Sequence, residues 1–351
     1  MKHRVAVVGA GYFASFHINA WLRLPDVELV AVIEHDIQKH TALKAITDAS
    51  PQTVIIDSLS LLKRDSVDLI DIATPPDTHA DLIAQSIKLQ CQTIICQKPF
   101  CGDLNSAFKL QKVIDNNNAR VVVHDNFRFQ PWYRKIKNIL DKNTLGDVLQ
   151  ASFRLRPGDG QGTDAYLERQ PYFRKMTKFL IHETGVHFID VFRYLFGEPH
   201  AVSAALDTLN PAIKGEDSGH FIFYYPSGLR AQFEGNRLLD HAADNTRLTM
   251  GELLIEGTKG SISLLGNGDL LQRRFGKNKW HPVDYHFDDT DFGGDCVYHL
   301  QKHVIEHLKN GSELENDSKN YLKNIEIEAL IYQAASQHRQ LKVPLANKPL
   351  E

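Results

Sequence analysis

The spacing of hydrophobic positions divides the chain into two parts with different patterns. In the first third, short and nearly continuous apolar runs alternate with helical segments. The runs are Val5 to Val8, Leu29 to Ile33, Val54 to Ile56, Leu69 to Ala73, Thr93 to Cys96 and Arg120 to Val123. Because such runs are typical of strands that are covered on both faces, this pattern predicts a doubly wound parallel α/β domain.

Strict alternation of apolar and polar residues replaces these runs from about Val148 onward. It is clearest from Ala151 to Leu155, and further runs flank turn sequences at 226–228 and 257–260. This alternation is typical of half-buried antiparallel strands and hairpins. With closing helices expected at Val297 to Lys309 and Ser318 to His338, the sequence predicts a second, α+β domain with a mostly antiparallel sheet.

Length and composition agree with two domains. The chain has 351 residues, of which 42% are hydrophobic, and this is enough to fill two cores. The change of pattern puts the boundary near residues 124–130, so we expect domains at 1–125 and 126–351. A formal net charge of −3 argues against a nucleic-acid partner, and the basic cluster at 273–279 is predicted to be a solvated hairpin.

Targeting and redox signals are few. No apolar run approaches transmembrane length, and the first residues lack the pattern of a cleaved signal, so we expect a cytoplasmic protein without a membrane partner. The cysteines lack paired C-x-x-C spacing, so we expect reduced, buried thiols and no metal site; they are Cys91, Cys96, Cys101 and Cys296.

A glycine motif follows the first apolar run. Gly9 permits a tight turn, Gly11 has no Cβ to block a phosphate, and Ala14 lets the next helix approach the strand. The helix N-terminus, with Tyr12 and Phe13 just before it, would then face the anion. The motif predicts a dinucleotide site, although glycines at a strand end also occur in plain turns.

The residue after the second run bears on the choice of dinucleotide. Glu34 can accept hydrogen bonds from both ribose hydroxyls of NAD and would repel a 2′-phosphate. We therefore expect NAD. Glu34 can also be read as an ordinary solvated loop acid, and the neighbouring His35 and Lys39 leave NADP open.

Two further strand ends carry candidate chemistry. Thr74-Pro75-Pro76, followed by His79, turns sharply at the carboxyl end of a strand, where doubly wound sheets bind ligands. We expect this turn to contact the nicotinamide ribose. The next strand delivers Gln97-Lys98-Pro99 to the same edge, which places an amine beside a substrate oxygen. A surface lysine at a strand end is the alternative reading of Lys98.

The segment from Phe179 to Phe196 has helical spacing. Glu183 and His187 stand at i and i+4, close enough for the carboxylate to orient the imidazole, as in a general base. Gly185 costs about 1 kcal/mol in helix propensity and would allow another group to approach closely. A histidine that only stabilises the fold is equally compatible with this pattern.

Six motifs in this order resemble the glucose-fructose oxidoreductase / inositol 2-dehydrogenase (Gfo/Idh/MocA) family over nearly the whole chain. The resemblance implies a Rossmann domain, a C-terminal α+β domain with a large open antiparallel sheet, and a sugar or cyclitol bound between them. The motifs are Gly9-x-Gly11-x-x-Ala14, Glu34, Thr74-Pro75-Pro76 with His79, Lys98-Pro99, Arg128-Phe129 and Glu183-x-Gly185-x-His187.

The resemblance also implies catalytic roles. In the family, the lysine of a Glu-Lys-Pro motif and a helix histidine act on the substrate hydroxyl, and these fall on Lys98 and His187. Glu183 stands where many members carry an aspartate. Gln97 departs from the family glutamate, and we expect it to orient Lys98 by hydrogen bonding, or else to mark a weakened enzyme.

Polar residues that the resemblance brings near the cleft are candidate substrate contacts, although each is also compatible with a surface position. They suit a polyol better than an apolar ligand, and they are Arg128, Arg156, Asp159, Tyr172, Arg174, His182 and Arg237.

The predicted reaction is hydride transfer between a CH–OH carbon of a sugar or polyol and nicotinamide. His187 takes the hydroxyl proton and Lys98 polarises the carbonyl oxygen. Two alternatives remain, a redox-neutral NAD-dependent sugar-processing enzyme and a non-catalytic NAD-binding sensor. Because an exposed sheet face with apolar residues is usually covered, we also expect a homodimer or homotetramer.

Overall fold

A computed structural model describes residues 2–40 and 43–344 of the chain, and these form two compact units. The first unit ends at Asn126 and takes in Asp295–Lys323, whereas the second starts at Phe127 and resumes at Asn324. The sequence-based division assigned all residues from 126 onward to the second domain, so residues 295–323 depart from it. Bonds within the first unit explain the difference, for example the ion pair of Arg23 with Asp295 at 2.6 Å.

The first unit is built on a six-stranded sheet in the order β3-β2-β1-β4-β5-β6, in which every pair is parallel. This is the strand order of the dinucleotide-binding Rossmann fold. The strands lie within two residues of the predicted runs, and they are β1 His3–Val8, β2 Val27–Ile33, β3 Val54–Ile56, β4 Leu69–Ile72, β5 Thr93–Gln97 and β6 Arg120–His124. The predicted parallel α/β domain is confirmed.

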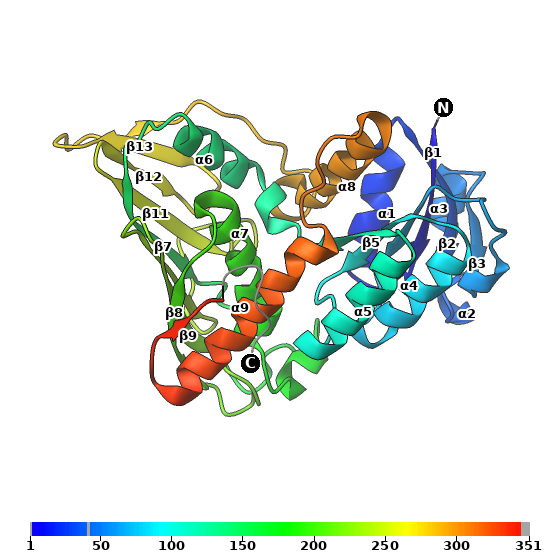
Figure 1. Cartoon of the computed structure of the whole chain (residues 1–351), viewed down its shortest axis with the longest axis horizontal. Coiled ribbons are helices and arrows are strands. Elements are labelled where there is room, and N and C mark those ends of the chain that lie inside the picture. The colour runs from blue at the N-terminus through cyan, green and yellow to red at the C-terminus, as the bar shows by residue number, and fades with distance from the viewer. Residues whose placement is uncertain (1, 41–42, 345–351) are drawn as a thin grey trace. The chain divides into compact units, whose positions relative to one another are not determined.

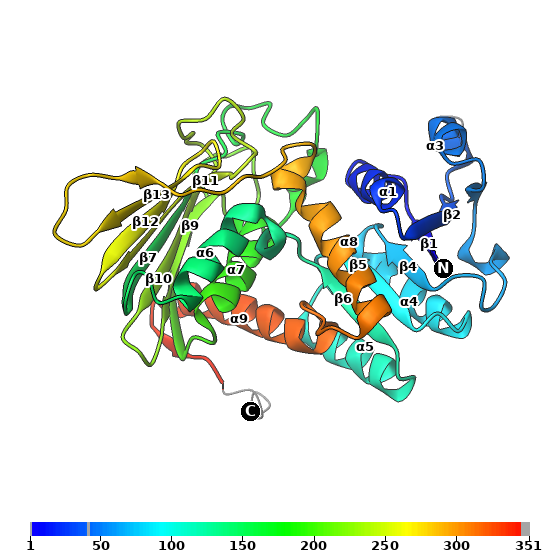
Figure 2. The same ribbon diagram turned by 90° about the horizontal axis from the view of Figure 1, so that it is seen from above.

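Helices cover both faces of this sheet, which explains why its strands are apolar on both sides. Figure 2 shows α1 and α8 on one face and α4 and α5 on the other. Asp103 caps α5 by accepting a hydrogen bond from the Ser106 N–H. The helices of this part of the chain are α1 Ala14–Arg23, α2 Ile37–His40, α3 Lys44–Ala49, α4 His79–Lys88, α5 Leu104–Asn116 and α8 Phe292–Asn310.

The second unit contains a nine-stranded sheet in the order β14-β13-β12-β11-β7-β10-β9-β8-β15. Only the β7–β10 pair is parallel among its described strand pairs, so the predicted mostly antiparallel sheet is confirmed. The strands are β7 Val148–Leu155, β8 Ala201–Asp207, β9 Ser218–Tyr224, β10 Arg230–Asn236, β11 Gly251–Gly257, β12 Gly260–Leu264, β13 Leu270–Arg274, β14 His281–Pro282 and β15 Leu341–Lys342.

Both predicted hairpins form in this sheet. Tyr224 of β9 pairs with Arg230 of β10 across the turn at 226–228. Gly257 of β11 pairs with Gly260 of β12, so the second turn contains only two residues. These turns fix the register that directs alternate side chains to the core.

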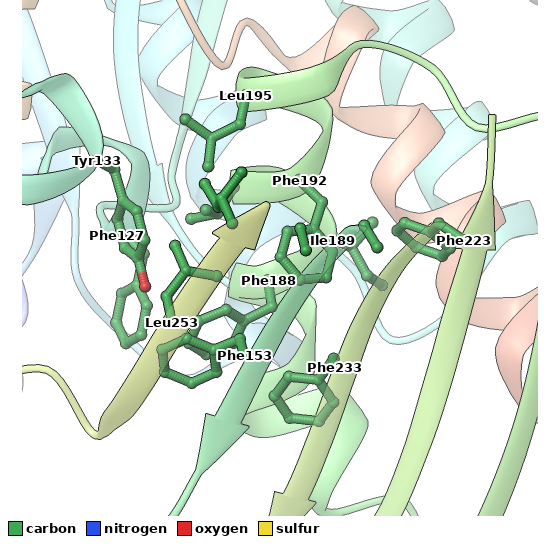
Figure 3. Close-up of a cluster of buried hydrophobic side chains, with 14 of the residues drawn as sticks. Phe127, Tyr133, Phe153, Phe188, Ile189, Phe192, Leu195, Phe223, Phe233 and Leu253 are labelled. Carbon is green, nitrogen blue, oxygen red and sulfur yellow. The ribbon is translucent and has the colours of Figure 1, made fainter. Parts of the chain in front are cut away.

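One face of the nine-stranded sheet packs against α6 Pro131–Asp141, α7 Val186–Phe196 and the part of α9 Ser318–Gln337 that starts at Asn324 (Figures 1 and 2). Aromatic residues fill the layer between sheet and helices, as Figure 3 shows. Phe153 of β7 lies 3.9 Å from Phe188 of α7, measured between ring centroids. Gly197, with φ at +83°, ends α7 as predicted.

All four cysteines are buried and outside disulfides, as predicted. Within residues 2–40 and 43–344, no helix has the length and apolar character needed to span a bilayer.

Candidate active site

The glycine motif lies at the carboxyl edge of the first sheet. Gly9 has φ at +103°, and a Cβ there would stand 2.8 Å from the carbonyl oxygen of Ala73 at the end of β4. Gly11 is different, because a Cβ there would meet no atom of the described chain within 4 Å. The motif therefore combines a tight turn with open space before α1, and this arrangement fits a pyrophosphate at a helix N-terminus.

Glu34 lies beside this motif, directly after β2, and is almost fully buried. Its Oε2 accepts a hydrogen bond from the Ala10 N–H and its Oε1 accepts one from the Asp36 N–H, both at 3.0 Å. Lys39 Nζ lies 3.8 Å from Oε2. His35 Nδ1 lies 3.2 Å from Oε1, so both carboxylate oxygens face donors of this chain at the place where a dinucleotide-binding fold has its ribose-binding acid.

The turn after β4 is connected to the loop after β5 by a histidine. Thr74 Oγ1 and Thr78 Oγ1 share a hydrogen bond of 2.7 Å, in the short 3-10 turn Pro76–Thr78 that leads into α4. His79 is fully buried, with Nε2 3.0 Å from the Thr74 oxygen and Nδ1 3.4 Å from the Phe100 oxygen. Burial lowers the pKa of His79, although both carbonyls act in the opposite direction. Because it is enclosed, His79 can influence a cofactor only through these two loops.

Gln97 occupies the last position of β5. Its Oε1 accepts a hydrogen bond from the Lys98 N–H at 2.7 Å, and its Nε2 lies 3.1 Å from Nε2 of His17. The amide thus holds the backbone nitrogen of Lys98. Whether Gln97 orients the lysine side chain stays a prediction.

In the second unit, the segment before α7 departs from the predicted helix. Leu180–Gly185 form a π-helical turn, and regular α-helix starts only at Val186. The α-helical i,i+4 spacing assumed for Glu183 and His187 therefore does not hold over this segment. Such turns are rare and occur frequently at functional sites.

His187 is nearly buried at the start of α7. Its imidazole is stacked on the ring of Phe127, with centroids 3.9 Å apart and 7° between the planes. The stack on Phe127 therefore holds the imidazole of His187, the predicted proton acceptor. The sequence did not indicate this contact.

Arg128 forms an ion pair inside the second unit. Its Nε and Nη2 donate to the two carboxylate oxygens of Asp190 at 2.7 and 2.6 Å. Asn324 Nδ2 donates to the same carboxylate at 2.8 Å. Asp190 is fully buried, so this bidentate pair accounts for the guanidinium position without a substrate.

Arg237 and Asp159 are also bound to each other. Arg237 Nη2 donates to Asp159 at 2.7 Å, Nε donates to the Tyr166 hydroxyl at 2.7 Å, and Nη1 donates to Thr184 at 2.8 Å. Burial by itself would lower the pKa of Arg237, but Asp159 and Tyr166 raise it. Because Thr184 belongs to the π-helical turn, this network fixes the turn that carries Glu183.

The remaining candidate substrate residues have individual contacts. Arg156 is buried and bonded to the backbone and carboxylate of Glu234. His182 Nδ1 lies 2.7 Å from Glu328 of α9. Tyr172 and Arg174 lie in the short turn Pro171–Lys175, where Tyr172 is half exposed.

Four partners of candidate site residues were not predicted from the sequence: His17, Asp71, Tyr166 and Asp190. A signal for His17 existed, because it stands three residues after Ala14 on the same helix. Asp71 lies 54 positions from His17, and Asp190 lies 62 positions from Arg128, so neither partner could be predicted from local spacing. Tyr166 is only seven positions from Asp159. Among residues 2–40 and 43–344, no three His, Cys, Asp or Glu side chains gather as metal ligands.

Comparison with known families matches both parts of the chain. Residues 3–125 match the oxidoreductase family with an NAD-binding Rossmann fold, and residues 133–263 match the GFO/IDH/MocA C-terminal domain. These ranges correspond to the parallel sheet and to much of the nine-stranded sheet.

Individual proteins agree with this match. The chain is 26% identical over 357 residues to a D-apiose dehydrogenase of Paraburkholderia graminis, covering 97% of this chain and 90% of the relative. It is 26% identical over 268 residues to an inositol 2-dehydrogenase of Rhizobium meliloti, covering 75% and 76%.

Among solved structures, an oxidoreductase from Agrobacterium radiobacter in complex with NAD+, L-tartaric acid and magnesium has a TM-score of 0.85 at 23% identity, covering 98% of this chain and 99% of that one. Levoglucosan dehydrogenase in complex with NADH and levoglucosan has a TM-score of 0.80 at 17% identity, covering 98% and 100%. Identities this low show the fold alone, whereas the two matched family domains identify the chain as a member of the GFO/IDH/MocA oxidoreductase family with an NAD-binding Rossmann domain.

Proposed function

We propose that this protein is a dehydrogenase that transfers a hydride between a CH–OH carbon of a sugar, cyclitol or related polyol and NAD. The observation that carries the proposal is the carboxyl edge of the first sheet, where the open space at Gly11, the buried Glu34 and the Gln97–Lys98 segment follow strands of one sheet. Relatives named as apiose and inositol dehydrogenases support the substrate class.

The cofactor, when bound, supplies the hydride acceptor, and the protein handles the proton. His187 accepts the proton of the substrate hydroxyl, and the hydride leaves the carbon that bears this hydroxyl for the nicotinamide, so the alcohol becomes a carbonyl. Lys98 stabilises the negative charge that develops on the oxygen by hydrogen bonding or charge. Glu183, in the π-helical turn, adjusts the orientation of the imidazole.

Only some of the candidate residues are proposed to contact the substrate hydroxyls directly. Arg128, Arg156, Asp159 and Arg237 are bound in ion pairs, so we assign them to shaping the substrate side of the second unit. Tyr172 and Arg174, which lie in a short turn and are more accessible, are the preferred direct contacts. His182, paired with Glu328, is assigned to holding the π-helical turn.

A substrate screen tests this proposal. Sugars, inositols and their acids are incubated with NAD and with NADP, while NADH absorbance and product formation are followed. Net NADH formation that is lost about 10²- to 10⁴-fold in Lys98→Ala and His187→Asn, with NAD affinity retained, supports the proposal. Product without net NADH identifies the redox-neutral enzyme, and ligand-induced thermal stabilisation without any product identifies the sensor. Either result contradicts the proposed dehydrogenase.

We also propose a cytoplasmic homodimer or homotetramer formed through the open face of the nine-stranded sheet. Figure 2 shows no helix of the described chain on that face. Ile222, Tyr224 and Leu254 alternate with core residues and so point to this open face, where they are only half buried. Light scattering after size exclusion measures the mass of the assembly. Ile222→Asp should lower this mass, and a monomeric wild-type protein would contradict the proposed oligomer.

The proposed cytoplasmic location is supported by the buried thiols, which suit a reducing compartment. Fractionation of cells tests the location.

A further inference from the structure

Three neighbouring strands of the first sheet direct polar side chains to the same face. Gln97 of β5 pairs with His124 of β6, and Asp71 of β4 pairs with Ile95, two residues before Gln97. Because side chains alternate along a strand, all three lie on one face of the sheet. His17 of α1 meets all of them there, with Nδ1 2.8 Å from Asp71, Nε2 3.1 Å from Gln97 and its ring centroid 4.0 Å from that of His124.

The hydrogen bonds determine how Gln97 and His17 are oriented. A backbone N–H can only donate, so the Gln97 atom that faces the Lys98 N–H is the carbonyl oxygen Oε1. The amide nitrogen then faces His17, and since this nitrogen can only donate, His17 Nε2 must accept. The ring proton is therefore on Nδ1, from which it is donated to Asp71.

Asp71 fixes the far end of this chain of bonds. Its side chain is fully buried, and its Oδ2 also accepts hydrogen bonds from Trp21 Nε1 at 2.7 Å and from Gln301 Nε2 at 3.4 Å. A buried carboxylate is costly unless such donors compensate it. Helices α1 and α8 both supply donors to Oδ2, which hold this oxygen beside His17, whereas Oδ1 is buried without a hydrogen-bond partner in the described chain.

We propose that His17 and Asp71 are positioning residues that hold Lys98 in place through the amide of Gln97. The chain of bonds runs from Asp71 to His17, to Gln97 and to the backbone nitrogen of Lys98. This inference rests on the proposed function to the extent that Lys98 contacts the substrate oxygen. It also explains what glutamine contributes at position 97. A glutamate there would present only acceptors, and the His17 ring would have to carry a proton on each nitrogen.

A kinetic comparison separates positioning from simple stabilisation. In His17→Asn, the short amide can still donate to Asp71 but provides no acceptor at the former Nε2 position. We expect kcat to fall at least about tenfold while NAD affinity and the substrate KM change less than about twofold. His303→Asn is the matched control, because His303 Nε2 also accepts one hydrogen bond in the same unit, from the Glu315 N–H. The inference is overturned if His17→Asn keeps the wild-type kcat, or if His303→Asn loses as much.

Two measurements do not depend on turnover. In ¹⁵N NMR spectra of the whole protein, His17 should carry its proton on Nδ1, and Gln97→Glu should add a proton at Nε2. If the His17 ring of the wild-type protein carries its proton on Nε2, the proposed chain of hydrogen bonds is overturned.

The second measurement is the rate at which pyridoxal phosphate modifies Lys98. The adduct is trapped by reduction and mapped by mass spectrometry, and its rate of formation should change several-fold in His17→Asn. An unchanged rate would overturn the positioning role. Failure of every polyol to react would overturn the proposed function instead, and these two readouts would still decide the inference.

Discussion

The imidazole of His187 lies parallel to the phenyl ring of Phe127, with the centroids 3.9 Å apart and the planes 7° apart. Both side chains are buried in the second unit, and Figure 3 shows Phe127 at the margin of the aromatic core. A leucine at position 127 fills similar space but offers no flat surface. We expect Phe127→Leu to lower kcat about tenfold, by allowing the imidazole to rotate, at a stability cost of about 1 kcal/mol. Steady-state kinetics and denaturant unfolding measure the two effects.

Phe153→Leu is the matched control for this change. Phe153 is another buried phenylalanine of the same core, stacked on Phe188 at 3.9 Å. The same loss of stability with an unchanged kcat is expected, because Phe153 is stacked on Phe188 and Phe233 and His187 is stacked on Phe127. Equal losses of kcat in both variants would mean that general loosening of the core, and not the stack on His187, limits the reaction.

The ion pair of Arg128 with Asp190 leads to a prediction about stability. Asp190 is fully buried, so Arg128→Met leaves a charged carboxylate with Asn324 as a donor but without its bidentate partner. We expect a loss of about 3–5 kcal/mol in the free energy of unfolding. The double variant Arg128→Met/Asp190→Leu removes both charges and should recover much of it. Urea unfolding of the whole chain measures these free energies. An Arg128→Met protein as stable as the wild type would contradict the prediction and would favour another role for Arg128, such as substrate binding.

His79 leads to a prediction about pH. Burial lowers its pKa below the ordinary value of 6.5, so between that value and its folded pKa the unfolded chain binds more protons than the folded one. Its contribution to stability is therefore complete above about pH 6.5 and is lost as the pH falls through the folded pKa. The unfolding free energy of His79→Gln should depend less steeply on pH in this window than that of the wild type. Parallel slopes for the two proteins, or an NMR titration of His79 at or above pH 6.5, would contradict this.

Local patterns predicted the elements of this fold well, but not the partners that join them. Continuous apolar runs identified β1 to β6, and alternation identified β7 and β9 to β12 of the second sheet, because burial on one or two faces leaves a direct periodic signal. The strands β8, β13, β14 and β15 were not predicted. The apolar face of α8 predicted a helix but did not indicate which core it covers, and the bond from Gln301 to Asp71 joins residues 230 positions apart.

The candidate site shows the same limit. Gly9, Gly11 and Glu34 could be proposed because a dinucleotide needs fixed spacing within one βαβ segment. Arg237 and Asp159 were both identified as polar candidates, yet their pairing across 78 positions leaves no periodic trace. The π-helical turn at Leu180–Gly185 was missed for a related reason, since its apolar residues also fit an α-helix.

The two motif glycines should respond differently to the same added methyl group. At Gly9, φ is +103° and a Cβ would stand 2.8 Å from the Ala73 oxygen, so Gly9→Ala should destabilise the fold by more than about 1 kcal/mol. At Gly11, a Cβ meets no atom of the described chain within 4 Å, and φ is not in the left-handed region, so Gly11→Ala should unfold at the wild-type temperature.

The open space that makes Gly11→Ala harmless to the fold is the space assigned to the pyrophosphate. We therefore expect this variant to bind NAD at least about tenfold more weakly, a loss of about 1.4 kcal/mol, while its melting temperature without ligand is unchanged. Calorimetric titration with NAD and thermal unfolding of the free protein measure the two quantities. Wild-type affinity in Gly11→Ala would place the phosphates elsewhere on the sheet edge. A large stability loss would instead show that the chain itself occupies this space, and the fit of the glycine motif to a dinucleotide would have to be abandoned.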